Sequence, residues 1–253
     1  MKESLNKMYN NQFQNSVCAC FEECKTDDFD VGCSFICNRS AKVGKKYSRE
    51  KIRIVFIGKE DVSSIKDLDE PASFISTKNQ HYRGTKSILA ALLGHCSVDD
   101  ITNKEKYIKD EETLHESFAL TNHYHCTFKT TKQSGKRHGI KNSDAMWDNC
   151  ANVVKKELEV LSPSVVVIQA GWSARKKSTQ ESRVKGVKAY FNEQWVVSED
   201  KEIFGLYIAK HNSGNTCYII GSYHPSFHKW NNDLYLEPLK QRVDKVRKII
   251  EFE

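Results

Sequence analysis

The sequence predicts an α/β fold: a three-layer α/β/α sandwich with a mainly parallel central sheet. Two apolar, β-branched runs, 53–57 and 165–168, are each followed by a glycine within a few residues, at Gly58 and Gly171. Runs of this kind are typical of strands that are buried on both faces of a parallel sheet. A segment with helical spacing lies between them, and strands that alternate with helices indicate an α/β architecture.

The helix between the two runs has the clearest pattern in the chain. From Ser143 to Leu161, apolar residues recur at intervals of three and four, and Pro163 follows directly. The remaining expected elements are a helix over 85–94, a strand over 118–122, strands over 205–209 and 216–222 joined by a turn, and a basic helix over 237–252 with Pro238 in its first turn. No element is predicted in the first thirty residues, and 97–116 is expected to form a surface helix or loop.

Composition narrows the class of protein. The 253 residues hold 39 Lys and Arg against 33 Asp and Glu, an excess that favours a polyanionic partner only where the basic residues cluster. We find no apolar run of membrane-spanning length and no signal-peptide pattern, so a cytoplasmic, soluble protein is expected, and we expect a monomer. Nine cysteines in a reducing compartment favour metal binding over disulfides.

Polar side chains follow three of the expected strands. Glu60 and Asp61 come just after the first strand, Asn122 ends the second, and His224 follows the last. Ligands bind at the carboxyl ends of strands in parallel sheets, so these groups would converge on one edge if the strands are parallel neighbours. The structural alternatives are a solvated acidic loop for Glu60 and Asp61 and turn residues for Asn122 and His224.

Five motifs occur in a fixed order along the chain. They are Gly58-Lys59-Glu60-Asp61-Val62, His81-Tyr82-Arg83-Gly84 before an apolar helix, Thr121-Asn122-His123-Tyr124-His125-Cys126, Cys150 with Glu157-Leu158 before the 163–171 strand, and His224-Pro225-Ser226. In this order and content the chain, from about Gly32 onward, resembles the uracil-DNA glycosylase superfamily, and most closely its iron–sulfur members. The resemblance implies a DNA N-glycosylase that flips a pyrimidine out of the helix and excises it.

The resemblance also implies roles for individual residues. Glu60 would position water or stabilise the cationic sugar, with Asp61 as the alternative carboxylate, and His224 would stabilise charge on the departing base. Asn122 would read the base through its amide and Tyr82 would stack on it, unless Tyr82 is a core or surface tyrosine. Lys59 and Gly58 complete the expected base-binding loop.

The first loop departs from the family pattern. Lys59 stands where the iron–sulfur enzymes have Glu, and Val62 stands where some members have a Tyr that rejects bases substituted at the fifth ring carbon. A modified pyrimidine, such as modified cytosine in foreign DNA, is therefore a possible target besides uracil in repair. The alternatives to an enzyme are a catalytically inactive member that binds nucleic acid, and an unrelated zinc-stabilised domain with a protein partner.

Cofactor and DNA contacts are predicted from cysteine and basic positions. The resemblance implies a 4Fe–4S cluster on Cys33, Cys37, Cys126 and Cys150, with structural zinc and free thiols as alternatives. The family's first cysteine pair is Cys-x-x-Cys, whereas Cys33 and Cys37, and also Cys20 and Cys24, are one residue further apart. The expected DNA contacts are Lys136, Arg137, Arg175 and Ser226. Residues 1–50 are expected to form a cysteine-rich extension, and 51–253 the catalytic domain.

Overall fold

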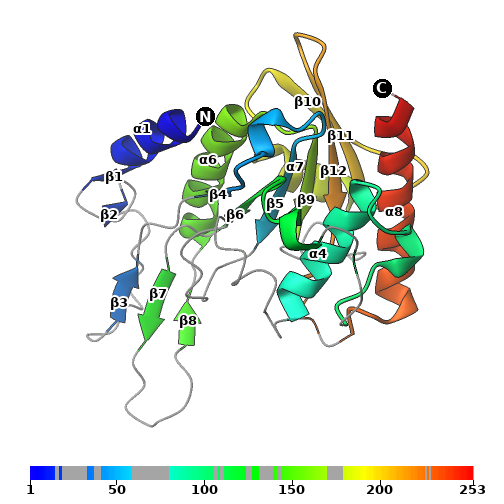
Figure 1. Ribbon diagram of the computed structural model, residues 1–253. Coiled ribbons are helices and arrows are strands. Elements are labelled where there is room, and N and C mark those ends of the chain that lie inside the picture. Colours follow the sequence, from blue (N-terminus) through cyan, green and yellow to red (C-terminus); the bar gives the residue numbers. More distant parts are fainter. Residues whose placement is uncertain are drawn as a thin grey trace.

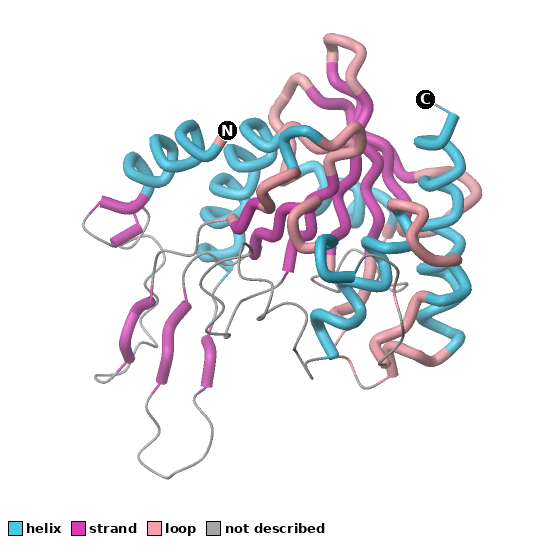
Figure 2. Tube along the Cα trace, in the orientation of Figure 1, coloured by secondary structure: helices cyan, strands magenta, loops and turns pink. Residues whose placement is uncertain are grey.

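A computed structural model describes most of the chain (Figures 1 and 2). The described residues are 1–14, 17–18, 33–36, 41–58, 80–104, 108, 111–123, 127–130, 139–141, 144–169, 179–225, 227 and 229–252.

A seven-stranded sheet with the strand order β10-β11-β12-β9-β5-β6-β4 organises the fold. Its strands, in sheet order, are β10 (Trp195–Glu199), β11 (Leu206–His211), β12 (Thr216–Gly221), β9 (Val165–Ile168), β5 (Ile54–Gly58), β6 (Phe118–Asn122) and β4 (Lys42–Val43). The four central strands, β12, β9, β5 and β6, are mutually parallel, and the three outer pairings are antiparallel. The α/β prediction is confirmed, and the parallel part of the sheet is its centre.

Buried side chains form one cluster on each face of this sheet. Alternate residues of a strand point to opposite faces, so Ile54 and Phe56 enter one cluster while Val55 and Ile57 enter the other. The first cluster packs against α4 (Gln80–Leu92) and α8 (Asp233–Phe252), and we call it the α4-side cluster. The second, the α6-side cluster, packs against α1 (Lys2–Gln12), α6 (Asp144–Leu161) and α7 (Gln180–Lys188). Figure 1 shows α4 and α8 on one side of the sheet and α6 on the other.

Shorter elements complete the described chain. They are β1 (Phe13–Gln14), β2 (Val17–Cys18), β3 (Cys33–Ile36), η1 (Tyr47–Arg49), η2 (Val98–Asp100), α5 (Glu111–Leu114), β7 (Thr127–Thr130) and β8 (Gly139–Lys141). Strands β3, β7 and β8 form a separate three-stranded sheet, which extends away from the main sheet (Figure 1). None of the helices in these described ranges is long and apolar enough to cross a membrane.

Helix boundaries differ from the prediction at two places. Helix α4 begins at Gln80 rather than 85, and α8 begins at Asp233 rather than 237. Pro238 therefore lies inside α8, where it cannot donate to the carbonyl of Leu234. Leu234 is 58% exposed, so this carbonyl belongs to the solvent-facing first turn, where the missing bond is cheap.

Several elements were not predicted. They are the short strands β1, β2, β3, β4, β7 and β8, and three longer elements, α1, α7 and β10. In α1 only Leu5 and Tyr9 are buried, and in α7 only Arg183 and Val187. Such sparse burial leaves too few apolar residues for a helical period to be visible. Strand β10 is an edge strand, and the apolar Val196 faces out with 65% of its surface exposed. The apolar and polar residues of β10 therefore do not alternate clearly in the sequence.

Candidate active site

Four residues form a row across the carboxyl edge of the parallel strands. Strand pairing sets Gly58 opposite Asn122, Ile57 opposite Ile168, and Ile168 opposite Gly221. The pairing continues one residue further, because the amide of Gln169 donates to Ile57 O and that of Ser222 donates to Ile168 O, both at 2.8 Å. The resulting order Asn122, Gly58, Gln169, Ser222, which we call the edge row, spans about 14 Å at the usual strand spacing.

The edge row faces the α4 side of the sheet. The residue two positions before each member of the row belongs to the α4-side cluster. In the order of the row, these residues are Leu120, Phe56, Val167 and Ile220. Side chains two positions apart in a strand share a face. The strand ends that precede Glu60 and Asp61, Asn122 and His224 therefore lie at one edge of the sheet, while Glu60 and Asp61 themselves lie outside the described residues.

Gly58 makes room for the side chain of Asn122. A Cβ atom at Gly58 would lie 2.5 Å from Asn122 Oδ1, closer than two such atoms approach. Asn122 therefore leans across the glycine toward the centre of the row, where its half-exposed amide is held at the sheet edge. The carbonyl of Gly58 accepts from the amide of His123 at 2.8 Å, which fixes the backbone next to Asn122.

A buried carboxylate fixes the residue before Asn122. Thr121 Oγ1 donates to Glu157 Oε2 at 2.6 Å, and Tyr9 Oη donates to the other oxygen of Glu157. Tyr9 Oη in turn accepts from the amide of Ala41 at 2.7 Å. Burial, together with the Glu157 carboxylate, raises the pKa of Tyr9 well above its usual range, so this hydroxyl keeps its proton and donates at all ordinary pH values. The network connects α1 and α6 to the base of the edge row.

His224 lies on a loop in which the carbonyl groups of three successive residues, Tyr223, His224 and Pro225, accept hydrogen bonds. Trp230 Nε1 donates to Tyr223 O at 3.1 Å, the amide of Phe227 donates to His224 O at 2.8 Å, and Asn103 Nδ2 donates to Pro225 O at 2.6 Å. Pro225 also packs against Gly84 in α4, where a Cβ atom would lie 2.5 Å from Pro225 Cβ. A loop held at so many points can present a half-buried His224 in one orientation.

Arg242 anchors the start of this loop from α8. Its guanidinium donates to Gly221 O at 2.7 Å and to Phe204 O at 2.6 Å, while only 4% of the residue is exposed. Burial lowers the pKa of Arg242 to about 10, so the group is still a cation at neutral pH. Arg242 therefore ties the last residue of β12 to the helix beneath the His224 loop.

Tyr82 lies inside the α4-side cluster, with 4% of its surface exposed. It belongs to the first turn of α4, close to Gly84 and Thr85. Gly84 contacts the His224 loop, and Thr85 contacts the edge row. A stacking role for Tyr82 therefore requires a base to enter from the sheet edge against the buried ring.

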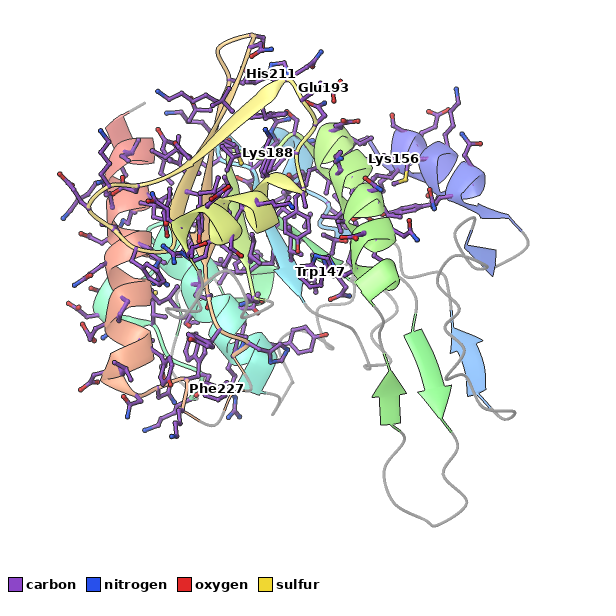
Figure 3. The ribbon with its side chains drawn as sticks, turned by 180° about the vertical axis from the view of Figure 1, so that it is seen from behind. Trp147, Lys156, Lys188, Glu193, His211 and Phe227 are labelled. Atoms are coloured by element: carbon purple, nitrogen blue, oxygen red, sulfur yellow. The ribbon has the colours of Figure 1, made fainter. Side chains whose placement is uncertain are left out.

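Two residues of this region were missed from the sequence. Gln169, in the edge row, is fully buried, and its Oε1 accepts from Thr85 Oγ1 at 3.1 Å. His123 lies on the opposite face, 2.8 Å from Tyr190 Oη through Nδ1 and stacked on Trp147 with ring centroids 3.4 Å apart. Trp147 lies near the start of α6 (Figure 3). The apolar run before Gln169 was the only sequence signal near it, and His123 lay inside the Thr121-to-Cys126 motif without a predicted role of its own.

Many predicted site residues lie outside the described part of the chain. These are Lys59, Glu60, Asp61, Cys37, Cys126, Lys136, Arg137, Arg175 and Ser226. Of the predicted ligands, Cys150 is fully buried in the α6-side cluster, and Cys33 begins β3. Within the described ranges, no group of three or more His, Cys, Asp or Glu side chains could hold a metal ion.

Compared with models of known protein families and with curated proteins, the sequence matches none. The chemistry of this site therefore has to be argued from its own residues. An amide at Asn122, a second amide at Gln169 and an imidazole at His224 offer donors and acceptors for a planar heterocycle and for charge that develops on it.

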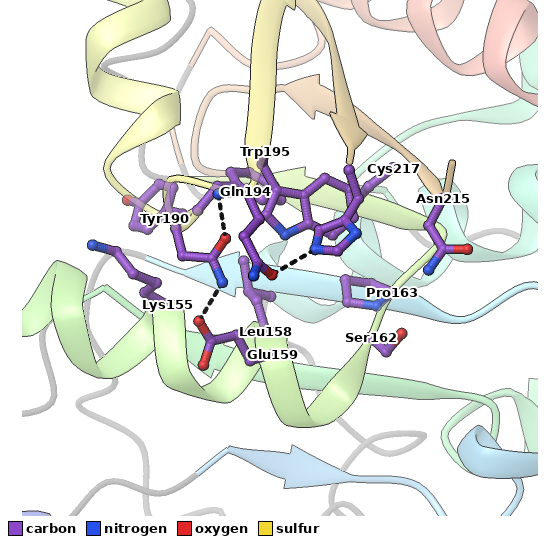
Figure 4. Close-up of a pocket in the computed structure, with 13 residues that line it drawn as sticks. Lys155, Leu158, Glu159, Ser162, Pro163, Tyr190, Gln194, Trp195, Asn215 and Cys217 are labelled. Atoms are coloured by element: carbon purple, nitrogen blue, oxygen red, sulfur yellow. Dashed lines mark hydrogen bonds between the residues drawn. The ribbon is translucent and has the colours of Figure 1, made fainter. Parts of the chain in front are cut away.

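A separate cavity of about 370 Å³ opens at the other end of the sheet (Figure 4). Its lining includes Pro163, Gln194 and Asn215, which precede β9, β10 and β12. His211 at this end and Phe227 beyond the His224 loop lie at opposite ends of the molecule (Figure 3). Some of the cavity's polar groups pair with each other, as in the 2.9 Å contact between His211 Nε2 and Gln194 Oε1 and the 2.8 Å bond from Asn192 Nδ2 to Glu159 Oε1.

Proposed function

We propose that the protein is a DNA N-glycosylase that excises uracil or a modified pyrimidine and leaves an abasic site. The observation that carries the proposal is the Asn122 amide, which leans over Gly58 at the edge where the rigid His224 loop also lies. The order of the five motifs resembles that of the uracil-DNA glycosylase superfamily. Helices on both faces of the sheet support a three-layer α/β/α sandwich, the fold that this resemblance implies.

Recognition in this proposal depends on the two amide atoms of Asn122. A flipped pyrimidine presents a carbonyl oxygen and a ring N–H or exocyclic amine on its Watson–Crick edge, and an amide can pair with one donor and one acceptor. The buried network of Glu157, Thr121 and Tyr9 fixes the backbone at Asn122, so the amide meets the base in one orientation. Tyr82 would supply the apolar face on which the base stacks.

Bond cleavage would use a cation-stabilising carboxylate and a donor to the leaving base. The glycosidic bond breaks through an oxocarbenium-like state, which Glu60 or Asp61 would stabilise while one of them orients water. His224 would donate a hydrogen bond to the base as negative charge builds on it, and such preorganised donors contribute about 10²–10³-fold in rate. Lys136, Arg137, Arg175 and Ser226 would bind the DNA backbone.

A 4Fe–4S cluster on Cys33, Cys37, Cys126 and Cys150 is part of the proposal, and thiolates are the donors that such clusters require. Pairing of Ile36 with Thr127 supports it, because the strands that lead to Cys37 and from Cys126 meet at that end of the β3–β7 pair. The extended strand β3 keeps Cys33 about 10 Å from Ile36 along the backbone. Cys33 is therefore the one of the four ligands that the strand geometry supports least, and iron and sulfide measurements on Cys33→Ser, beside Cys24→Ser from the other N-terminal pair, decide between the two pairs.

A catalytically inactive nucleic-acid-binding protein is the second candidate, and Lys59 directly after Gly58 favours it. Glu60→Ala distinguishes the two, since an enzyme loses excision and keeps DNA binding while a binder has no excision to lose. The decisive experiment is excision from oligonucleotides that contain uracil, hydroxymethylcytosine or glucosylated hydroxymethylcytosine, read by cleavage at abasic sites. Protein purified without oxygen should act on at least one substrate, and inactivity on all of them, with iron and sulfide bound, would contradict the proposal.

A further inference from the structure

Gln169 is a buried amide that is bonded on one side only. None of its surface is exposed, and Oε1 accepts from Thr85 Oγ1 at 3.1 Å. Within the described part of the chain, the buried Nε2 has no hydrogen-bond partner. Thr85 fixes which way the amide is turned, so the two N–H bonds of Gln169 point away from the threonine and are left to donate elsewhere.

The position of Gln169 identifies what those N–H bonds can meet. In the edge row it is the neighbour of Gly58, and its Cα lies about 10 Å from that of Asn122, two strand spacings away. Gly58 has no side chain, and the side chain nearest to the place of its missing Cβ atom, within the described part of the chain, is that of Asn122. All three residues face α4, on the same side as Tyr82 and Thr85.

The unpaired Nε2 of Gln169 is unfavourable for stability. A buried donor without a partner destabilises a fold, and an apolar residue of similar shape would avoid that cost. Val167 and Val165 lie two and four positions before Gln169, on the same face of β9. Both are apolar and fully buried. A glutamine at the carboxyl end of such a strand is therefore explained by a ligand more readily than by packing.

We infer that Gln169 is a specificity-determining residue, whose Nε2 donates a hydrogen bond to an oxygen of the flipped base. The inference rests on the proposed function, and it adds a second amide to the one at Asn122. A fixed N–H donor can bond to a ring carbonyl or a hydroxymethyl oxygen. It disfavours an amino group at the same place, because two donors then face each other. Gln169 therefore selects pyrimidines by the oxygen that they present to the centre of the edge row.

Binding of uncleavable DNA tests this inference without requiring excision. The probes are oligonucleotides with a single 2′-fluoroarabino nucleotide bearing uracil or hydroxymethylcytosine, since the fluorine disfavours the oxocarbenium-like state, and an unmodified oligonucleotide is the reference. The protein variants are Gln169→Met, which removes the donor, and Gln169→Glu, which keeps an acceptor for Thr85. The matched control is Gln241→Met at an exposed position of α8.

We expect the wild-type protein to bind at least one probe tenfold or more tightly than the reference. Gln169→Met and Gln169→Glu should reduce that preference to threefold or less, whereas Gln241→Met should keep it. Loss of preference for the uracil probe alone indicates the O4 carbonyl as the acceptor, loss for the hydroxymethylcytosine probe alone the hydroxymethyl oxygen, and loss for both the O2 carbonyl that the two bases share.

Two results would overturn the inference, and they differ in what they leave standing. A wild-type preference that both Gln169 variants retain means that the amide is structural or bound only to water, while the proposed function survives. A wild-type protein without any preference removes the proposed function, and the inference with it. Gln169→Glu decides the matter if Gln169→Met does not fold.

Discussion

Gly58→Ala should separate recognition from stability at the edge row. The new Cβ would lie 2.5 Å from Asn122 Oδ1, and ordinary contact begins at 3.4 Å, so the oxygen has to move by 3.4 − 2.5 = 0.9 Å. That oxygen is the end of a side chain that can rotate, so the strand itself need not shift. Alanine in place of glycine within a strand also gains about 0.5–1 kcal/mol of backbone entropy. We expect the free energy of unfolding to change by less than about 1 kcal/mol.

The same displacement should strongly reduce excision. A misplacement of about 1 Å at a positioned group costs about 100-fold in rate, or about 2.7 kcal/mol at 1.36 kcal/mol per tenfold. The assay is single-turnover excision on whichever substrate the wild-type protein cleaves, with urea unfolding of the same samples. If Gly58→Ala acts by moving Asn122, the double variant with Asn122→Ala should be no slower than Asn122→Ala alone.

Two outcomes of this experiment would refute the reasoning. Full activity of Gly58→Ala would mean that the orientation of Asn122 does not matter for the reaction. A double variant slower than Asn122→Ala by the full effect of Gly58→Ala would mean that the two residues act independently.

Three further substitutions test the supports of the site by urea unfolding. Gly84→Ala should lower the free energy of unfolding by up to about 2 kcal/mol. Its Cβ would meet the rigid Pro225 ring at 2.5 Å, a strain of about 1–3 kcal/mol, against roughly 1 kcal/mol gained in helix propensity; a stabilised variant would contradict this. Tyr9→Phe should cost about 1–3 kcal/mol, since it removes the hydrogen bond to Glu157 Oε1 and the acceptor of the Ala41 amide. An unchanged stability would mean that water replaces the hydroxyl. Arg183→Met should lower the free energy of unfolding by about 3–5 kcal/mol, because Glu199 stays buried after losing the 2.8 Å ion pair. The double variant with Glu199→Leu should recover part of this loss. A double variant less stable than Arg183→Met would argue against this cause.

Local pattern was sufficient to predict the centre of the fold. Strands β5 and β9 are fully buried runs of β-branched and aromatic residues, and α6 repeats its apolar residues over eighteen positions, so each element carries its own signal. Because parallel neighbours end at the same edge, the convergence of Gly58 and Asn122 also followed from the strand ends alone.

The parts that escaped prediction depend on contacts between distant segments. The bond between Thr85 and Gln169 joins residues 84 positions apart, and that between Tyr9 and Glu157 joins residues 148 apart. Nothing in the sequence around Gln169 or Tyr9 encodes such a partner. Helix α1 is likewise stabilised by packing of Leu5 and Tyr9 on the α6-side cluster rather than by its own polar sequence.

The most direct test of the central claim is detection of the free base released from DNA by the wild-type protein and by His224→Ala. Chromatography with mass detection identifies the base, and the DNA affinity of each protein is measured in parallel. We predict release of a free pyrimidine by the wild-type protein, about 10²–10³-fold slower release by His224→Ala, and DNA affinities within about threefold of each other. Absence of any free base, or equal rates for the two proteins, would contradict the assignment of this sheet edge as a glycosylase active site.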